Sequence, residues 1–264
     1  MSQTDPYNAT IVQRWDQNEY TSIFTVRPDS GACPPFEPGQ FTTLGLIDPD
    51  APPKKDGRKP MILRAYSIAS SPTVRETMEF YIILVDNGKL TPKLWKLREG
   101  GRLWLSPKIS GEFTLDGVPA DRDMVWVSTG TGIAPFVSMY RRYRGQNRWK
   151  RAVVINGCRL ARDLGYVSEF ERYAREDGNC VYLPTVTREP EGSDWKGLRG
   201  RVPLALEPQT YEKLVGAPLV PEQCHVFLCG NPQMIDDVEA MLLQRGFKTH
   251  KKRDPGNIHL ERYW

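Results

Sequence analysis

The pattern of apolar residues changes once along the chain, near residue 120, and this change limits the possible folds more than any other feature. Before it, short alternating runs are separated by Gly and Pro clusters, as in an antiparallel β-barrel or sandwich. After it, apolar strands alternate with helices, which implies a parallel sheet covered by helices. We therefore predict two domains, an antiparallel β-barrel over residues 1–118 and a parallel α/β domain over residues 119–264.

Local signals place the individual elements of the first half. We expect strands at Ala9–Trp15, Tyr20–Val26, Phe41–Ile47, Ala65–Ala69, Met78–Val85 and Arg102–Leu105. One helix should have Thr91 as its cap, Pro92 at its first position and Gly100 just beyond its end. The stretch 48–60 is too rich in Pro and charge for a strand, so we expect a loop there.

The second half is expected to alternate between strands and helices. Its predicted strands are Met124–Ser128, Ala152–Asn156, Cys180–Val186 and His225–Leu228. One helix should begin near Pro135, and a second should cover Ser168–Arg175. A third should follow Asn231 as its cap, with Pro232 first and Gly246 past its end.

Composition excludes several classes of protein. A net charge of +4 is too small for a typical nucleic-acid binder, and no apolar run approaches the roughly 18 residues of a membrane helix. The first residues lack the basic start and apolar core of a signal peptide, so we expect a cytoplasmic protein. The five cysteines, Cys33, Cys158, Cys180, Cys224 and Cys229, show no metal-type spacing. Any redox group must therefore be bound rather than built from cysteine.

Two motifs in the first half could hold a ligand. In Arg64-Ala65-Tyr66-Ser67, the arginine could bind a phosphate and the tyrosine could lie flat on a conjugated ring. The alternative is a half-exposed strand with a surface Arg and a core Tyr. The glycine turn Gly88–Pro92 could present backbone N–H groups to a pyrophosphate, although a capped surface helix explains it equally.

Two further motifs follow predicted strands of the second half. Ser128–Pro135 places glycines at a strand-to-helix turn, where the backbone can approach a dinucleotide closely, although Pro135 replaces the third glycine of the usual fingerprint. A generic tight turn is the alternative. Leu228–Gln233 ends another strand, and both motifs should meet at the carboxyl edge of the sheet. There Cys229 could leave room for a flat ring or be merely a small buried residue.

Taken in order, RAYS, GKLTP, GTGIAP, CGNPQ and a terminal Tyr263-Trp264 resemble the ferredoxin(flavodoxin)–NADP reductase family, bacterial type. The resemblance implies an FAD-binding barrel, an NADP-binding α/β domain and a C-terminal tail that returns to the flavin. The implied FAD residues are Arg64, Ala65, Tyr66, Ser67, Lys89, Leu90, Thr91, Thr131, Tyr263 and Trp264. The implied NADP residues are Cys158, Arg159, Thr187, Arg188, Arg201, Asn231, Pro232, Gln233 and Asp237. Ser67, Cys229 and Trp264 would lie at the reacting ring as the catalytic set.

The resemblance also implies the activity. NADPH would deliver a hydride to flavin N5, and the reduced flavin would then pass electrons one at a time to an acidic carrier protein, ferredoxin or flavodoxin. We expect the protein to be a monomer. Arg188 and Arg201 would grip the 2′-phosphate, since two guanidinium groups suit a phosphate, whereas the adjacent Glu189 is of the kind found in NAD sites. Trp264 would cover the flavin and move aside during turnover, so its deletion should weaken discrimination against NADH.

Other functions are compatible with parts of the sequence. One is the NAD(P)H-dependent reductase component of an oxygenase or cytochrome system, and another is a non-catalytic flavin-binding regulator. The basic residues of loop 48–60, and those near the C-terminus from Lys248 to Arg253, could steer an acidic carrier or simply be solvated.

Overall fold

The computed structural model describes residues 5–262 and divides into two compact units. One contains the residues up to Thr114 together with Val137–Arg142, and the other contains Leu115–Phe136 and the residues from Tyr143 onward. The predicted domain boundary at 118/119 stays a prediction. No helix among residues 5–262 is long and apolar enough to cross a membrane.

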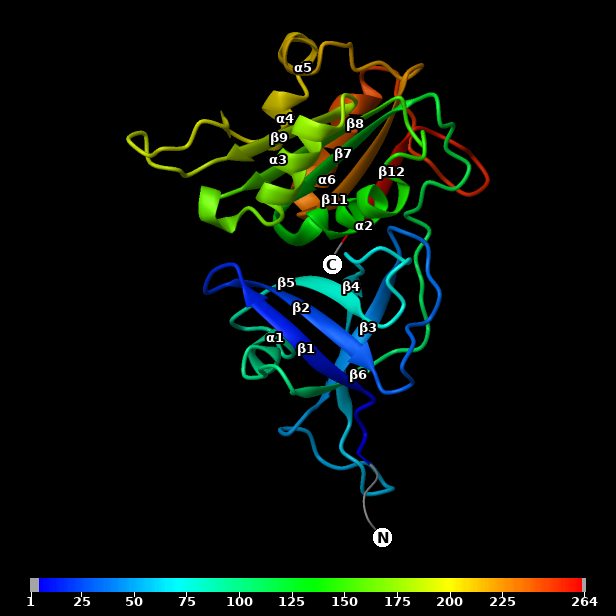
Figure 1. Cartoon of the computed structure of the whole chain (residues 1–264), viewed down its shortest axis with the longest axis vertical. Coiled ribbons are helices and arrows are strands. Elements are labelled where there is room, and N and C mark those ends of the chain that lie inside the picture. The colour runs from blue at the N-terminus through cyan, green and yellow to red at the C-terminus, as the bar shows by residue number, and fades with distance from the viewer. Residues whose placement is uncertain (1–4, 263–264) are drawn as a thin grey trace. The chain divides into compact units, whose positions relative to one another are not determined.

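The first unit is a six-stranded antiparallel sheet (Figure 1). Its strands are β1 (Ala9–Asp16), β2 (Thr21–Pro28), β3 (Phe41–Ile47), β4 (Met61–Ser67), β5 (Met78–Ile83) and β6 (Arg102–Leu105), in the order β4-β3-β6-β1-β2-β5. Alternate side chains of these strands, including Phe24, Leu44 and Phe80, form one apolar core. This confirms the predicted antiparallel β architecture. Among the described residues no ladder joins β4 to β5, so the barrel-like sheet is not closed, although Ala69 N, just after β4, donates to the Glu79 carbonyl of β5 at 2.8 Å.

Two details of the first unit correct the sequence prediction. Strand β4 begins at Met61 rather than Ala65, because β3 pairs with it over its whole length, from Ile47 opposite Met61 to Phe41 opposite Ser67. The helix α1 spans only Thr91–Leu94, is capped by Leu90 and ends well before Gly100. Thr91 is therefore not the cap.

The second unit is a six-stranded parallel sheet flanked by helices (Figure 1). Its strands are β7 (Asp123–Thr129), β8 (Arg151–Cys158), β9 (Cys180–Val186), β10 (Leu198–Arg199), β11 (Cys224–Gly230) and β12 (Ile258–Arg262). The helix α2 (Ala134–Tyr143) follows β7 in the chain, and its residues Val137–Arg142 belong to the first unit. The other α-helices are α3 (Val167–Glu176), α4 (Val202–Ala205), α5 (Pro208–Val215) and α6 (Pro232–Leu243), and short 3₁₀ turns cover Gly130–Ile133 and Ala161–Asp163. This confirms the predicted α/β fold. The sequence prediction missed β10, α4, α5 and β12.

The strand order of the second sheet fixes where a ligand can bind. The order is β10-β9-β8-β7-β11-β12. After β7 the chain adds β8, β9 and β10 on one side of β7, and it then crosses back to add β11 and β12 on the other side. Strands β7, β8 and β11 are buried almost throughout, as expected for the centre of a parallel sheet. The direction of winding reverses between β7 and β11, and sheets of this kind bind ligands at the carboxyl edge beside such a reversal.

Candidate cofactor-binding sites

The turns after β7 and β11 interlock at the point where the winding reverses. A Cβ atom on Gly132 would lie 2.4 Å from the carbonyl oxygen of Cys229, and one on Gly230 would lie 2.5 Å from Thr129 Oγ1. Gly230 also has a φ of +127°, which side chains rarely adopt. The backbone N–H of Asn231 donates to Thr129 Oγ1 at 2.8 Å. The two glycine motifs are thus brought together, and only glycine permits this approach.

Helix α6 begins at this same edge. The Asn231 side chain caps it by accepting hydrogen bonds from the N–H groups of Gln233, at 2.9 Å, and Met234, at 3.3 Å. Pro232 occupies the first turn, as predicted from the sequence. Gln233 Nε2 donates to Asp237 Oδ1 at 2.8 Å, which joins these two exposed residues on one side of the helix. The positive end of α6 therefore lies beside the glycine turns, a favourable place for an anionic ligand.

Three arginines, which we call the arginine edge, follow neighbouring strands: Arg159 after β8, Arg188 after β9 and Arg201 after β10. The N–H of Arg188 donates to the carbonyl of Arg159 at 2.8 Å. All three side chains are exposed. Within residues 5–262 none of their guanidinium groups has a hydrogen-bond or ion-pair partner. Unpaired guanidinium groups at adjacent strand ends suit a phosphate.

The cysteines at this edge, the partly buried Cys158 and the buried Cys229, have structural contacts. Cys158 Sγ donates to the carbonyl of Asp163 at 3.3 Å, and burial raises the Cys158 pKa to about 12. The Cys158 carbonyl accepts hydrogen bonds from the N–H and Oγ1 of Thr187. Cys229 is fully buried, and its Sγ lies 3.8 Å from Glu261 Oε2. Cys158 is therefore a neutral thiol at neutral pH and no nucleophile.

In the first unit, the RAYS motif lies on the edge strand β4. Arg64 and Ala65 are exposed, Ser67 is buried, and Tyr66 is partly buried against the core. Arg64 Nη1 donates to the carbonyl of Leu63 at 2.8 Å. Burial raises the Tyr66 pKa above its usual value, although the nearby Arg64 opposes the rise, so the phenol stays protonated. The motif thus offers a neutral aromatic surface with a cation two residues away on the same strand face.

The turn from Lys89 to Thr91 presents backbone donors. The N–H groups of Lys89, Leu90 and Thr91 have no acceptor among the described residues. The Leu90 side chain is buried in the core. Thr91 Oγ1 accepts from the N–H of Val85 at 2.9 Å and donates to the Val85 carbonyl at 3.2 Å. Thr91 therefore closes the turn with its hydroxyl group, while its backbone N–H stays available to a phosphate.

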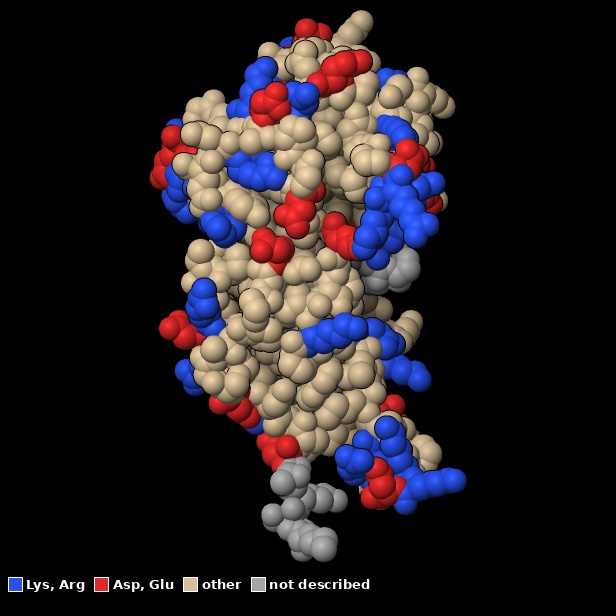
Figure 2. All heavy atoms as spheres, turned by 90° about the vertical axis from the view of Figure 1, so that its right-hand side faces the viewer, with Lys and Arg blue, Asp and Glu red and all other residues tan. Residues whose placement is uncertain are grey.

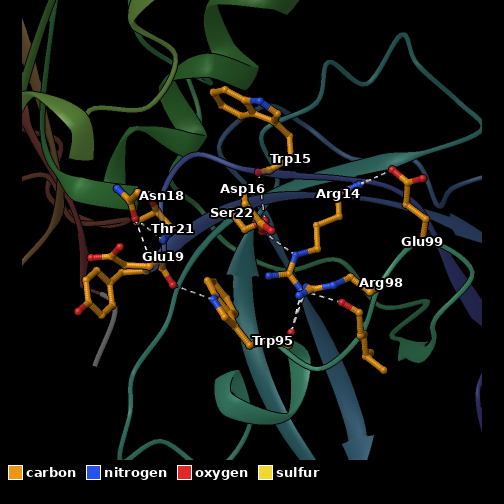
Figure 3. A network of polar contacts seen from close by, with 12 residues as sticks. Arg14, Trp15, Asp16, Asn18, Glu19, Thr21, Ser22, Trp95, Arg98 and Glu99 are labelled. Atoms are coloured by element: carbon orange, nitrogen blue, oxygen red, sulfur yellow. Dashed lines mark hydrogen bonds and ion pairs between the residues drawn. The ribbon is translucent and has the colours of Figure 1, made fainter.

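A buried arginine, Arg14, which was not singled out from the sequence, holds the chain just after α1, at Trp95 and Leu97 (Figure 3). The Arg14 side chain is 4% exposed, and its Nη1 donates to the carbonyls of Trp95, at 2.9 Å, and Leu97, at 2.6 Å. Its guanidinium lies about as close to the Phe24 ring, 5.0 Å, as to the Trp95 ring, 5.2 Å, and pairs with Asp16 at 2.7 Å. Arg14 thereby ties β1 to the end of α1. Its place in strand β1 gave no signal for a bond to residues 81 positions away.

Comparison with known proteins decides the family. A family model described as "Oxidoreductase NAD-binding domain" matches residues 126–240. The flavodoxin/ferredoxin–NADP reductase of Escherichia coli (strain K12) is 36% identical over 259 residues, which cover 97% of this chain and 96% of that protein. The protein of the same name from Buchnera aphidicola subsp. Schizaphis graminum is 33% identical, with 97% of both chains covered. The chain belongs to the flavodoxin/ferredoxin–NADP reductase family.

Solved structures agree with this membership of the reductase family. A crystal structure of a ferredoxin NADP+ reductase from Neisseria gonorrhoeae, with bound FAD and NADP, has a TM-score of 0.83 and 26% identity, and the match covers 99% of this chain and 100% of that one. A flavohemoglobin from Malassezia yamatoensis has a TM-score of 0.76 at 18% identity, which shows a shared fold alone. The family resemblance predicted from the five motifs is confirmed.

Some of the predicted site residues stay predictions for this reductase. Tyr263 and Trp264 lie outside the described residues. Thr131 is buried in the turn after β7, and its predicted contact with a flavin remains a prediction. Ser67 and Cys229 are buried near the ends of β4 and β11, and their place at the reacting ring is likewise a prediction.

Proposed function

We propose that this protein is an FAD-containing oxidoreductase that transfers electrons between NADPH and ferredoxin or flavodoxin. The observation that carries the proposal is the match to flavodoxin/ferredoxin–NADP reductases over nearly the whole length of both chains. The unpaired arginine edge supports the choice of NADPH. Its arginines follow β8, β9 and β10, the three strands on one side of β7, and β7 leads into the first glycine turn.

The first unit carries the groups that FAD needs. Arg64 is exposed and free to turn from the Leu63 carbonyl towards a pyrophosphate, and the N–H groups of Lys89, Leu90 and Thr91 supply further donors. Tyr66 would pack against the ring system with its neutral phenol. Ser67 would lie near the reacting edge, and Thr131 is a further proposed flavin contact. These residues fit the proposed group in charge and shape.

The second unit carries the groups that NADPH needs. Arg188 and Arg201 would bind the 2′-phosphate, with Arg159 beside them. Asn231, Pro232, Gln233 and Asp237 would line the nucleotide at the start of α6, together with Cys158 and Thr187. Cys229 and the glycine turns would leave space for the nicotinamide at the sheet edge.

When bound, the flavin accepts a hydride from NADPH and passes electrons on singly, which is chemistry that the protein itself does not supply. The side chains bind and orient the two cofactors and exclude water. The raised pKa of Cys158 keeps its thiol protonated at neutral pH, so it cannot accept a proton as a base, which is consistent with a reaction that needs positioning more than proton transfer. Trp264, with Tyr263 beside it, would shield the ring from water and withdraw during turnover.

An acidic carrier would be attracted to the basic segment from Lys248 to Arg253. Lys251, Lys252 and Arg253 are exposed there. They belong to the segment between α6 and β12, which is drawn red in Figure 1. Figure 2 shows Lys and Arg gathered in several groups on one face of the molecule. The loop at residues 48–60 is the second candidate. Both segments hold some internal pairs: Arg58 pairs with Asp56 at 2.6 Å in the loop, and Lys248 pairs with Asp254 in the C-terminal segment. We also propose a monomeric, cytoplasmic protein.

The test is NADPH-driven reduction of cytochrome c, with and without added flavodoxin or ferredoxin. The expected result is a rate that depends on the carrier and falls steeply as ionic strength rises. Lys251→Glu with Lys252→Glu should reduce carrier-dependent turnover several-fold, while Lys54→Glu with Lys55→Glu serves as the charge-matched control. A carrier-independent rate, or a carrier-dependent rate that salt leaves unchanged, would contradict the proposed partner.

A further inference from the structure

The loops after β8 and β9 are joined by three successive hydrogen bonds that extend the sheet past its ends. Thr187 N donates to the Cys158 carbonyl at 3.1 Å, and Arg188 N donates to the Arg159 carbonyl at 2.8 Å. The third bond departs from the backbone pattern, because the side chain of Glu189 replaces the backbone: Ala161 N donates to Glu189 Oε2 at 2.7 Å.

The backbone of Glu189 is also held in place, by the side chain of Arg199. Arg199 Nη1 donates to its backbone carbonyl at 2.6 Å, and Arg199 Nη2 donates to the Pro190 carbonyl at 3.1 Å and to Ser193 Oγ at 3.2 Å. The Glu189 side chain is only partly exposed, whereas the adjacent Arg188 is exposed. The carboxylate is therefore held against the first residue of the 3₁₀ turn Ala161–Asp163, on the loop that carries Arg159.

This geometry reverses the expectation from charge alone. An acidic residue beside a 2′-phosphate should repel it and favour NAD, as acidic residues in dinucleotide sites do when they bind the ribose hydroxyl groups. Here the carboxylate accepts a hydrogen bond from a backbone amide and joins the two loops that present Arg159 and Arg188. A charge-assisted bond of this kind is among the stronger hydrogen bonds in proteins.

We propose that Glu189 is a positioning residue for 2′-phosphate recognition, and that it favours NADPH by holding the loops of Arg159 and Arg188 together. The proposal rests on the proposed function and deepens it. It predicts that removing the acceptor at position 189 weakens binding of a 2′-phosphate, although the same change removes a negative charge from its neighbourhood.

Three variants separate the acceptor from the charge. Glu189→Ala removes both, and Glu189→Gln removes the charge but keeps an amide oxygen that can accept from Ala161 N. Glu191→Ala is the matched control, because this exposed residue of the same loop has no partner among the described residues. Isothermal titration calorimetry would measure the affinities of adenosine 2′,5′-bisphosphate and of AMP, which need no electron transfer, and far-UV circular dichroism would verify that each variant is folded.

The wild-type protein should prefer the bisphosphate by about tenfold or more, since the added phosphate gains charge-assisted hydrogen bonds. Glu189→Ala should lower that preference by about three- to tenfold, whereas Glu189→Gln and Glu191→Ala should stay within about twofold of wild type. A preference that rises in both Glu189 variants, stays unchanged in Glu189→Ala, or is preserved while both ligands weaken equally would overturn the positioning role. A wild-type protein without any preference would instead contradict the proposed NADPH site itself.

Discussion

If the arginine edge binds the 2′-phosphate, the double variant Arg188→Ala/Arg201→Ala should use NADPH poorly and NADH almost as well as the wild type. Both side chains are exposed and have no partner among the described residues, so their removal should leave the fold of the sheet intact. The β9–β10 ladder keeps them at neighbouring strand ends, because Leu198 lies opposite Thr185 and Gly200 N donates to the Val186 carbonyl at 2.8 Å. Their loss should therefore act on the ligand alone.

The size of the effect follows from the bonds that would be lost. A hydrogen bond to a charged group contributes about 1.5–3 kcal/mol, and exposure places these arginines at the lower end of that range. Two such contacts amount to about 3 kcal/mol, which corresponds to a fall of about 100-fold in kcat/KM for NADPH. NADH lacks the 2′-phosphate, so its kcat/KM should change less than about twofold.

The assay is steady-state reduction of ferricyanide with NADPH and with NADH as donors. Arg175→Ala is the matched control, since it removes the same charge from an exposed position on α3 without a described partner. Equal losses with both donors in the double variant, or no loss with NADPH, would refute the assignment of these arginines to the phosphate.

Three further outcomes are expected. Gly132→Ala would place a Cβ atom 2.4 Å from a backbone carbonyl, so urea unfolding should show a loss of about 3 kcal/mol and nucleotide binding should weaken; unchanged stability would contradict the described contact of the two turns. Burial lowers the pKa of His225 to about 4 and that of His259 to about 3, below the unfolded value near 6.5. Stability should therefore fall as the pH drops from 6.5 towards 4, by about 2 kcal/mol at pH 5 for the buried His259 and by less for His225, which solvent reaches. His259→Phe should remove the larger part of this loss in thermal unfolding. Arg14→Met removes the hydrogen bonds to the Trp95 and Leu97 carbonyls, of which only the Trp95 carbonyl keeps another donor among the described residues, Arg98, so it should cost about 2–4 kcal/mol in urea unfolding and weaken FAD binding. A variant of wild-type stability would refute the anchoring role.

Long apolar elements with clear end signals were predictable from the sequence. The helix after Asn231 begins where its cap and its proline predict, and Cys180–Val186 was predicted at its observed bounds. The short elements were not predictable, because their stability comes from neighbours in space. Strand β12 is one example. It pairs in parallel with β11, beginning with Ile258 opposite Val226, and nothing in its own five residues indicates this pairing.

The same distinction holds for the candidate site. The glycine motifs were identifiable because their spacing reflects a local turn, and the structure brings the two together. The roles of Thr91 and Glu189 could not be read from the sequence. Thr91 bonds through its side chain to Val85 within the preceding turn, and Glu189 bonds to the distant Ala161. The sequence predicted Thr91 as a helix cap and NADP as the cofactor, with Glu189 as the one residue that raised a question about that choice. In the structure the Thr91 hydroxyl closes its own turn, and the Glu189 carboxylate joins the loops after β8 and β9.

We expect this chain to hold a flavin that NADPH reduces. The most direct measurement is the visible absorption spectrum of the purified protein during anaerobic titration with NADPH. We expect a yellow protein whose flavin bands bleach with about one equivalent of NADPH, and much more slowly with NADH. A colourless protein that takes up no added FAD, or flavin bands that NADPH leaves unchanged, would contradict the account.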